Sequence, residues 1–483
     1  NWDRGATVSE DIEMGNTIKN QRQFDLQANL NLLSLYNKNK YLKKINQKFN
    51  NTRTTAKKTE KKKKPKLEKE IVLSPDSATV VEHGMFTKKV QITARRTDGR
   101  VYKVKFKPIN FAQVKILNQD TVRLKLTIIP GPAPTEDFLY KAVEHSARFL
   151  MMVRRFNIQF TNSAGMMLPG FRPEIGDIFG QGRSSFGLSP GIGFAFGDVR
   201  RSYIDEAYEK GWLITDTERD VNAAVSTKNL NIRANLEPIT GLKIDLTALR
   251  NDTRNTEIQF MYEGMPEIMG GNFTMTTIAL GSAFGGSGNA MNNYSSKAFD
   301  KLLANREIIA QRIESKYSGL KYPDVGFIHD KGLGGMPYNP GTDNVNGVNR
   351  NSADVLIPAF LAAYTGKDPK KVGLTAFPSL KSMLPNWRVT YDGLIKIPAV
   401  KKYFKSLTLS HQYRCSYSVG AFTSFLNWVD AGQDGLGYIQ SILNDNPTPS
   451  SPYSISSVSL TEAFSPLLGA DATLLNNVTV RAD

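Results

Sequence analysis

The stretch Leu407–Val419 alternates strictly between two kinds of side chain. Leu, His, Tyr, Cys and Val occupy one phase, and Ser, Thr, Gln and Arg occupy the other. Because successive side chains of a β-strand point to opposite faces, this pattern predicts a strand with one apolar and one polar face. The segment 387–392 alternates in the same way, and a Lys-rich turn around Pro398 joins the two. The sequence therefore predicts a two-faced hairpin.

Two architectures can use such a hairpin. A soluble sandwich turns the apolar face to a core and the polar face to water. A transmembrane barrel turns the apolar face to lipid and the polar face to a wet lumen. The hairpin alone leaves both open.

Length and hydropathy are compatible with a barrel. The 483 residues have a mean hydropathy of −0.34, and no run approaches the roughly 20 apolar residues of a membrane helix. Barrels have this composition because only every second strand residue meets lipid. The first residues carry no basic segment followed by an apolar one, and residues 476–483 stop within an alternating pattern. We therefore expect an internal portion of a longer chain.

Further two-faced strands are predicted at 23–32, 153–161, 229–248 and 470–481. Three short turns, at 237–241, around Pro398 and at 465–469, alternate with loops of tens of residues. Outer-membrane barrels sort short turns and long loops to opposite sides in this way. The expected fold is mainly all-β, as part of a large antiparallel transmembrane β-barrel with long loops and a few short helices.

The same patterns predict five regions. Their order is barrel strands (1–36), a basic linker with a small soluble β-module as a periplasmic insertion (37–134), barrel strands with a Gly/Pro-rich loop (135–262), a long extracellular insertion (263–385), and barrel strands with a loop (386–483). Helical periods at 295–317 and 353–364 make the insertion partly helical.

The net charge of +17 is concentrated in one segment. Fourteen Lys or Arg and only three Glu lie between Lys38 and Glu70. The run Lys57–Lys69 has no aromatic residues among its charges, and such runs stay solvated. Nucleic-acid binding would need interleaved aromatics or a folded module. We expect a flexible tether or an anionic-surface contact, and no nucleic-acid partner.

The histidines, the cysteine and the glycine-rich motifs of the chain predict neither an enzyme nor a cofactor. The four histidines lie in unrelated contexts, and a single cysteine, Cys415, leaves no disulfide framework and no Cys-based zinc site. The glycines of Gly191–Gly197 have the wrong spacing for a dinucleotide fingerprint, and the chain has no P-loop. We expect no catalytic, metal or cofactor site.

Each strand face then receives a predicted role. The lumen-facing candidates on the polar phase are Arg233, Asn235, Gln412, Arg414 and Ser416. The lipid-facing candidates on the apolar phase are Leu407, Leu409, Tyr413 and Tyr417.

Several longer segments resemble the SprA/Sov family, the outer-membrane translocon of the type IX secretion system that is linked to gliding motility. They are LPGFRPEIGDIFGQ, LANREIIAQRI, DVLIPAFLAAYTGKDP, LPNWRVTYDGL and SISSVSLTEAFSPLLG. The resemblance implies a giant single-chain barrel in the cell outer membrane that passes folded, secreted cargo proteins. It also implies a PorV-like shuttle barrel and a plug protein as partners, with outer-membrane lipid around the wall. The family is defined by a pore, so no functional residue is carried over.

Two alternatives stay open beside this hypothesis. Another outer-membrane barrel, such as a porin-like channel or a nutrient transporter, would bring a plug domain and a small ligand. A soluble, basic, β-rich binding module would dissolve without detergent, with its apolar phases packed on each other.

Overall fold

The chain forms two compact units. Unit 1 contains residues 1–31, 153–237 and 241–483, and unit 2 contains residues 32–152 and 238–240. The fold is mainly β, with 46% strand and 22% helix. The computed structural model describes residues 2–3, 15–50, 66–73, 79–84, 90–110, 112–117, 121–130, 138–174, 176, 181–184, 187–215, 222–260, 266–286, 288–324, 333–339, 347–433, 435–440 and 447–483.

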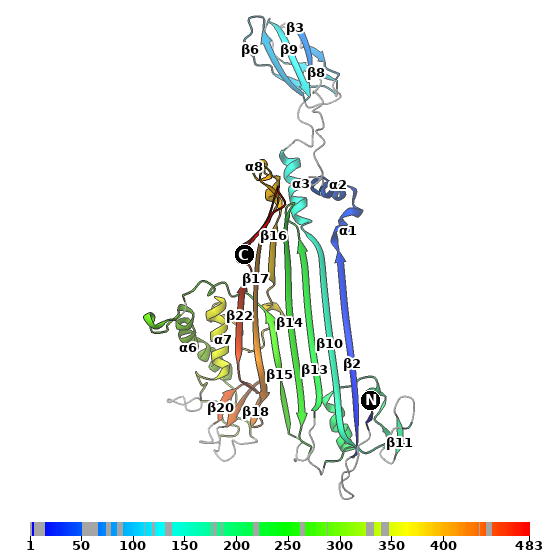
Figure 1. Cartoon of the computed structure of the whole chain (residues 1–483), viewed down its shortest axis with the longest axis vertical. Coiled ribbons are helices and arrows are strands. Elements are labelled where there is room, and N and C mark those ends of the chain that lie inside the picture. The colour runs from blue at the N-terminus through cyan, green and yellow to red at the C-terminus, as the bar shows by residue number, and fades with distance from the viewer. Residues whose placement is uncertain are drawn as a thin grey trace. The chain divides into compact units, whose positions relative to one another are not determined.

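Unit 1 is built on one antiparallel sheet of long strands (Figure 1). The two expected hairpins are present, as β13 with β14 and β16 with β17. Along its main path the sheet has the order β1-β2-β10-β13-β14-β15-β17-β23-β24. The strands are β1 (Trp2–Asp3), β2 (Asn16–Asn31), β10 (Val153–Phe171), β13 (Asn222–Leu236), β14 (Leu242–Ile258), β15 (Glu267–Thr276), β16 (Asn386–Tyr391), β17 (Phe404–Ser424), β21 (Tyr453–Ile455), β22 (Val458–Phe464), β23 (Gly469–Leu474) and β24 (Thr479–Ala482).

The position between β14 and β17 is filled by two strands lying end to end. β15 and β16 both run antiparallel to β14 and to β17. Side chains replace backbone partners at the junction. Thr276 Oγ1 accepts a hydrogen bond from the Leu249 backbone N–H at 3.1 Å, and Asn386 Oδ1 accepts one from the Cys415 N–H at 2.8 Å. The sheet therefore stays hydrogen-bonded where residues 277–385 leave it.

The expected boundary at residue 263 is corrected by this arrangement. β15 belongs to the sheet, because its backbone pairs with both neighbouring strands. The segment that leaves the sheet begins at Thr277, in the middle of a strand position rather than at a strand end.

The turn expected at 465–469 does not form a hairpin. β22 and β23 lie on the same side of β17 and run in the same direction. β17 is 21 residues long, which gives room for both. Backbone bonds continue across the bend, since Gln412 N–H donates to Pro466 O at 2.9 Å and Ser465 N–H donates to Gln412 O at 3.1 Å. The chain reverses later, between β23 and β24.

The described parts of 277–385 and 425–452 together form what we call the insertion unit. It holds η3 (Ala290–Asn292), α6 (Lys297–Tyr317), α7 (Ala353–Thr365), η5 (Leu380–Ser382), β18 (Trp428–Gln433), β19 (Leu436–Gln440) and β20 (Pro447–Ser450). Both helices match the expected positions. The turn between β16 and β17 contains η6 (Gly393–Lys396) and α8 (Pro398–Lys401).

A second covering segment, the loop cluster, spans the described residues of 181–214. It contains β11 (Gly182–Ser184), β12 (Gly187–Ser189), α4 (Ile192–Ala195) and α5 (Arg201–Glu209). The expected Gly/Pro-rich loop therefore contains the short helix α4, and α5 follows directly after it. The buried apolar side chains Phe194, Tyr203 and Ile204 give this segment its own core.

Unit 2 contains a small β-sandwich, in agreement with the expected β-module. One sheet has the order β3-β9-β5-β6 and the other β4-β8-β7, around buried Ile71, Val81, Val114 and Leu126. The strands are β3 (Leu67–Val72), β4 (Val80–Glu82), β5 (Val90–Arg96), β6 (Val101–Tyr102), β7 (Phe106–Pro108), β8 (Gln113–Ile116) and β9 (Arg123–Pro130).

Helices flank this module in the chain. They are α1 (Leu32–Lys38), α2 (Lys40–Asn50) and α3 (Phe138–Leu150). The expected linker is thus helical at its start, where Ile45 is buried and Asn46 contacts Met151. Most of the basic run Lys57–Lys69 lies outside the described residues.

Candidate functional site

The two faces of the large sheet differ in chemistry along most of its width. Strand pairing fixes which side chains share a face, because directly paired residues point to the same side. Leu30, Phe156, Ala234 and Leu246 follow one another across four strands on one face. Their neighbours Asn29, Asn157, Arg233 and Thr247 do the same on the other.

The apolar band is the uncovered part of the first face. Every side chain in it is half-exposed or exposed. The band comprises Leu26, Ala28, Leu30, Phe156, Ile158, Phe160, Leu230, Ile232, Ala234, Leu236, Leu242, Ile244, Leu246, Trp387, Val389, Tyr391, Leu407, Leu409, Ala470, Ala472 and Val480. His411, half-exposed within the same phase, points Nδ1 at Leu467 O, 2.6 Å away.

The opposite polar face carries mainly Ser, Thr, Asn and Gln. It brings together the five lumen-facing candidates. Asn235, Asp245, Arg388 and Gln412 form one row, and Asn235 donates a hydrogen bond to the Asp245 carboxylate. The other members follow from the register. Arg233 is two residues from Asn235 on β13, while Arg414 and Ser416 continue the phase of Gln412 on β17. No segment of unit 1 forms an apolar core on this face among the described residues.

Two of the four lipid-facing candidates are covered by the protein itself. Tyr413 and Tyr417 are 0% and 1% exposed. Tyr413 Oη accepts a hydrogen bond from the Ala279 N–H at 2.8 Å, and Tyr417 Oη donates to Ala376 O at 2.9 Å. This corrects the expectation that both face lipid, because residues 277–385 lie on them. Leu407 and Leu409 stay half-exposed in the apolar band.

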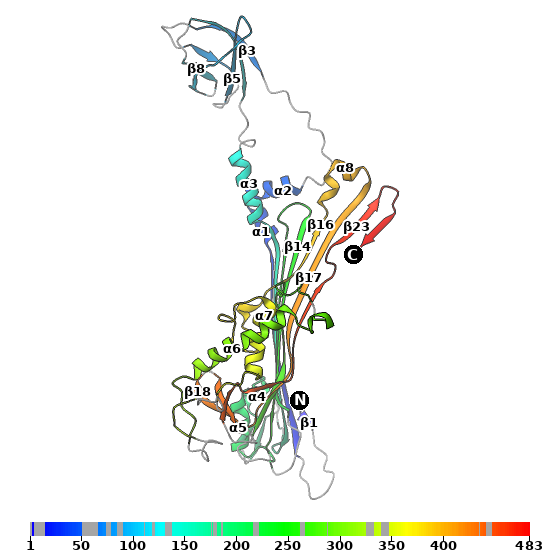
Figure 2. The same cartoon turned by 90° about the vertical axis from the view of Figure 1, so that its left-hand side faces the viewer.

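The insertion unit and the loop cluster both pack on the first face, and Figure 2 shows α4, α5, α6 and α7 on the same side of the sheet. The insertion unit packs on Phe273, Met275, Tyr417 and Val419. The loop cluster packs on Ile18, Met166 and Leu168. One face of the sheet is therefore divided into a covered half and a bare half.

The border between the halves is visible in β14. After Ala248 the phase that had been apolar continues with Arg250, Asp252 and Arg254. Arg250 donates to Pro378 O at 2.5 Å and lies 4.6 Å from the ring centroid of Phe273. These contacts join Arg250 to the insertion unit and to strand β15. The change from apolar to charged residues on β14 therefore marks the position at which the insertion unit begins to cover the sheet. That change is the sequence signal that the interpretation of the strands missed.

Aromatic rings gather along this border. Trp387 stacks on Tyr413 with centroids 4.4 Å apart, and Phe464 lies 5.1 Å from Tyr413. Phe284 of the insertion unit stacks on Phe464 at 5.4 Å. The border therefore carries a row of four rings.

The insertion unit is fastened by buried tyrosines. Tyr317, Tyr322, Tyr338 and Tyr438 lie with centroids 5.1–6.0 Å apart. Tyr317 Oη donates to Gly437 O at 2.8 Å, which joins α6 to β19. Burial raises the pKa of all four phenols, because it disfavours the charged phenolate.

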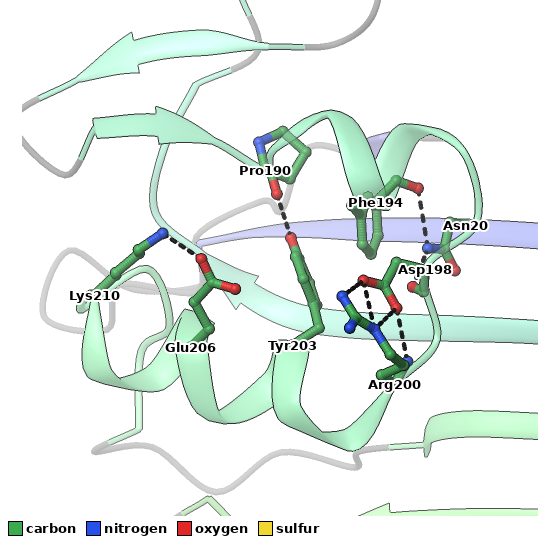
Figure 3. A network of polar contacts seen from close by, with 8 residues as sticks. All are labelled: Asn20, Pro190, Phe194, Asp198, Arg200, Tyr203, Glu206 and Lys210. Carbon is green, nitrogen blue, oxygen red and sulfur yellow. Dashed lines mark hydrogen bonds and ion pairs between the residues drawn. The ribbon is translucent and has the colours of Figure 1, made fainter.

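The loop cluster is fastened by polar contacts, shown in Figure 3. The Asn20 amide on β2 donates to Phe194 O at 3.1 Å and to Asp198 O at 2.7 Å. Tyr203 Oη donates to Pro190 O at 2.7 Å. Hydrogen bonds from Arg200 lower the pKa of the Asp198 carboxyl. These contacts hold α4 and α5 against the sheet.

Within the described residues, His, Cys, Asp and Glu form no group of three or more that could hold a metal ion. None of the described helices combines the length and the apolar character needed to cross a membrane. No family model matches the chain, and no curated protein matches it.

Proposed function

We propose that this chain forms part of the wall of an outer-membrane protein-conducting channel, the translocon of the type IX secretion system, which the SprA/Sov resemblance names. The observation that best supports this proposal is the uncovered apolar band on one face of the sheet, with a polar face directly opposite it. A barrel in a bilayer needs this inverted arrangement, because lipid surrounds it and water fills it.

Aromatic rings at one border of the apolar band support the proposal. On β13 the band runs from Leu230 to Leu236, which at about 3.3 Å per residue is about 20 Å along the strand. Outer-membrane barrels carry an apolar band about 25 Å tall with aromatic residues at its borders. The row formed by Trp387, Tyr413, Phe464 and Phe284 occupies such a border position.

The edges of the sheet support a wall that continues in further strands. Among the described residues, β2 pairs along its length with β10, but on its other side only Thr17 and Ile18 pair, with β1. In the same part of the chain, β24 pairs only with β23. Unpaired backbone groups in lipid cost several kcal/mol each. A sheet of this kind would therefore sit in a membrane only with more strands joined to both edges.

The chemistry of the polar face suits the passage of folded proteins. Its hydroxyl and amide side chains keep a wide channel hydrated, and its charged side chains include both signs, such as Arg388 beside Asp245. Cargo would move without chemical change, with a PorV-like barrel and a plug protein as the partners that receive it and seal the pore.

Adjacent cysteines on β13 test this proposal. In outer membranes of cells that express the protein, Ile232→Cys and Arg233→Cys are compared in a Cys415→Ala background. A water-soluble maleimide should label Arg233→Cys at least tenfold faster, and a lipid-soluble maleimide should reverse the order. Equal labelling of both positions by the water-soluble reagent would exclude a lipid-facing band.

A further inference from the structure

One segment of the insertion unit exposes large apolar side chains beside the aromatic border. We call residues 280–286 and 288–296 the interface loop. Leu280, Phe284, Met291 and Tyr294 are 41%, 73%, 98% and 75% exposed. The chain has no Asp, Glu, Lys or Arg from Ile268 to Ser296. An exposed apolar segment without charge is suited to an apolar partner rather than to water.

The interface loop begins at the border of the apolar band. The Ala279 N–H donates to Tyr413 Oη at 2.8 Å. Phe284 then stacks on Phe464 with centroids 5.4 Å apart and an interplanar angle of 30°. Since Phe464 is paired with Tyr413 on the sheet, the loop extends the row of rings away from the strands. In Figure 1 the green segment before α6 projects outward from the sheet.

The conformation of the loop holds its side chains outward. Asn293 and Tyr294 have φ angles of 51° and 58°, in the left-handed region that non-glycine residues rarely adopt. The Tyr294 N–H donates to Asn289 O at 2.8 Å, and a Cβ at Gly288 would overlap Tyr294 O. Glycine at 288 thus permits the turn that displays Tyr294. Observed backbone strain of this kind is a pointer to function.

The base of the loop is tied to the rest of the insertion unit. Ser282 Oγ donates to Tyr364 O at 2.9 Å, at the end of α7. Gly281 packs on Gly366, because a Cβ added to Gly281 would lie 3.4 Å from the Cα of Gly366. Phe284 and Met291 are therefore presented from a fixed base.

We propose that the interface loop is a lipid anchor, which inserts Phe284, Met291 and Tyr294 into the boundary between headgroups and acyl chains around the channel wall. This inference rests on the proposed function, because it takes the apolar band as the neighbouring lipid contact. Aromatic rings are enriched at this depth of a bilayer. Exposed Lys297 and Lys301 follow in the first turns of α6 and would reach anionic headgroups.

Depth-dependent fluorescence quenching tests the anchor in the full protein. In a Cys415→Ala background, Met291→Cys carries an environment-sensitive NBD label, and vesicles contain a phospholipid spin-labelled near its headgroup. Met291→Cys is suited because its side chain is almost fully exposed. Tyr294→Cys provides a second position. Ser315→Cys is the matched control, exposed on the last turns of α6. We expect at least twofold quenching at 291 and 294, and none at 315.

A label in the apolar band, in the same vesicles, distinguishes the lipid anchor from the channel wall. Labelled Ile232→Cys should be quenched by a spin label placed deep in the acyl chain. Quenching at 232 without quenching at 291 and 294 would overturn the anchor and leave the channel wall intact. Absence of quenching at all three would overturn both. If added partner proteins alone protect 291 and 294, a protein surface covers the loop and the lipid assignment is wrong.

Discussion

At the scale of single residues, a few polar side chains attach long covering segments to the sheet. Asn20 is the clearest case. Its amide donates to two carbonyls of the loop cluster, and its Oδ1 accepts from the Met166 N–H at 3.1 Å. Tyr413 has the same role for the insertion unit, because its Oη accepts a hydrogen bond from the Ala279 N–H, while it donates to Glu462 on the neighbouring strand β22. Because hydrogen bonds are directional, such residues set where a segment docks as well as how tightly.

Replacing Asn20 by Ala should loosen the loop cluster. Three hydrogen bonds are lost, and the freed Phe194 and Asp198 carbonyls have no replacement donor from the methyl side chain. We expect about 1–3 kcal/mol less protection of the amides in α4 and α5, measured by native-state hydrogen exchange. Asn29→Ala, at an exposed position of the same strand, is the control and should change protection by less than about 0.5 kcal/mol. Equal effects of the two substitutions would contradict the role of Asn20.

At the same scale, Glu307 makes the stability of α6 depend on pH. Arg350 donates to Glu307 Oε1 at 2.9 Å, and this partner lowers the pKa of the Glu307 carboxyl from 4.5 to about 2. A lowered pKa means that the contribution to stability is present above 4.5 and is lost as the pH falls toward about 2.

The measurement compares Glu307→Gln with the unchanged protein. Protection of α6 amides should differ between them at pH 6 and this difference should shrink strongly toward pH 2, because about half of the carboxylate is then protonated in the unchanged protein. The Glu307 side chain is exposed, so the difference should shrink in high salt. A difference that persists unchanged at pH 2 would show that the carboxylate charge is not its cause.

At the scale of elements, one alternating pattern serves two environments. The apolar phase of β17 is continuous from Leu407 to Val419, but its first part is bare and its second part is buried under the insertion unit. A protein core and a lipid layer both select apolar side chains, so alternation alone does not distinguish them. β14 does distinguish them, because its phase turns charged at Arg250.

Neighbouring charge insertions on β14 separate the two faces. Leu246→Arg places a charge in the apolar band, whereas Thr247→Arg places it on the polar face. In a membrane the first should cost about 2–4 kcal/mol and the second close to nothing, measured by urea unfolding of the protein in lipid vesicles. If the two substitutions cost the same, the band does not contact lipid.

At the scale of the whole molecule, each of the two units has buried apolar clusters of its own among the described residues. The β-sandwich of unit 2 encloses its own apolar cluster, with Leu126 at 0% exposure. The clusters of unit 1 involve other residues throughout. Small cores are marginally stable, so unit 2 should be the more fragile one.

A core cavity in unit 2 should therefore act locally. Leu126→Ala removes buried methyl groups and should cost about 2–5 kcal/mol, enough to open most of the sandwich. Hydrogen exchange followed by mass spectrometry should show fast exchange in the strands from β3 to β9 and unchanged protection in β10, β13 and β14. Thr93→Ser, at an exposed position of β5, is the mild control and should leave both units protected. Loss of protection in both units together on Leu126→Ala would contradict their independence.

Much of the element pattern was predictable because periodicity is local. The hairpins, α6, α7 and the β-module follow from the alternation or helical period of their own residues. Long-range pairing was not predictable in the same way. Ser465 and Pro466 look like a hairpin turn, yet β17 is long enough to bind the strands on both sides of them.

The candidate site was predictable in its polar half and only partly in its apolar half. Arg233, Asn235, Gln412, Arg414 and Ser416 share one face because parity alone determines it. The expected lipid contact of Tyr413 and Tyr417 is wrong, since nothing in their own strand tells that residues 277–385 return to cover them. Similarly, α2 was missed because its segment was interpreted by its charge alone, although Tyr41, Leu42, Ile45 and Phe49 recur at helical spacing.

The junction between β15 and β16 is a point at which the sheet can accept an insertion. Thr276 and Asn386 close the interrupted ladder with their own side chains, so the chain can depart and return there while β14 and β17 keep their alignment. Genetic gain, loss or exchange of an entire domain at that point would leave the spacing of every neighbouring strand untouched. The covering segment could thus change without any change in the sheet that carries it.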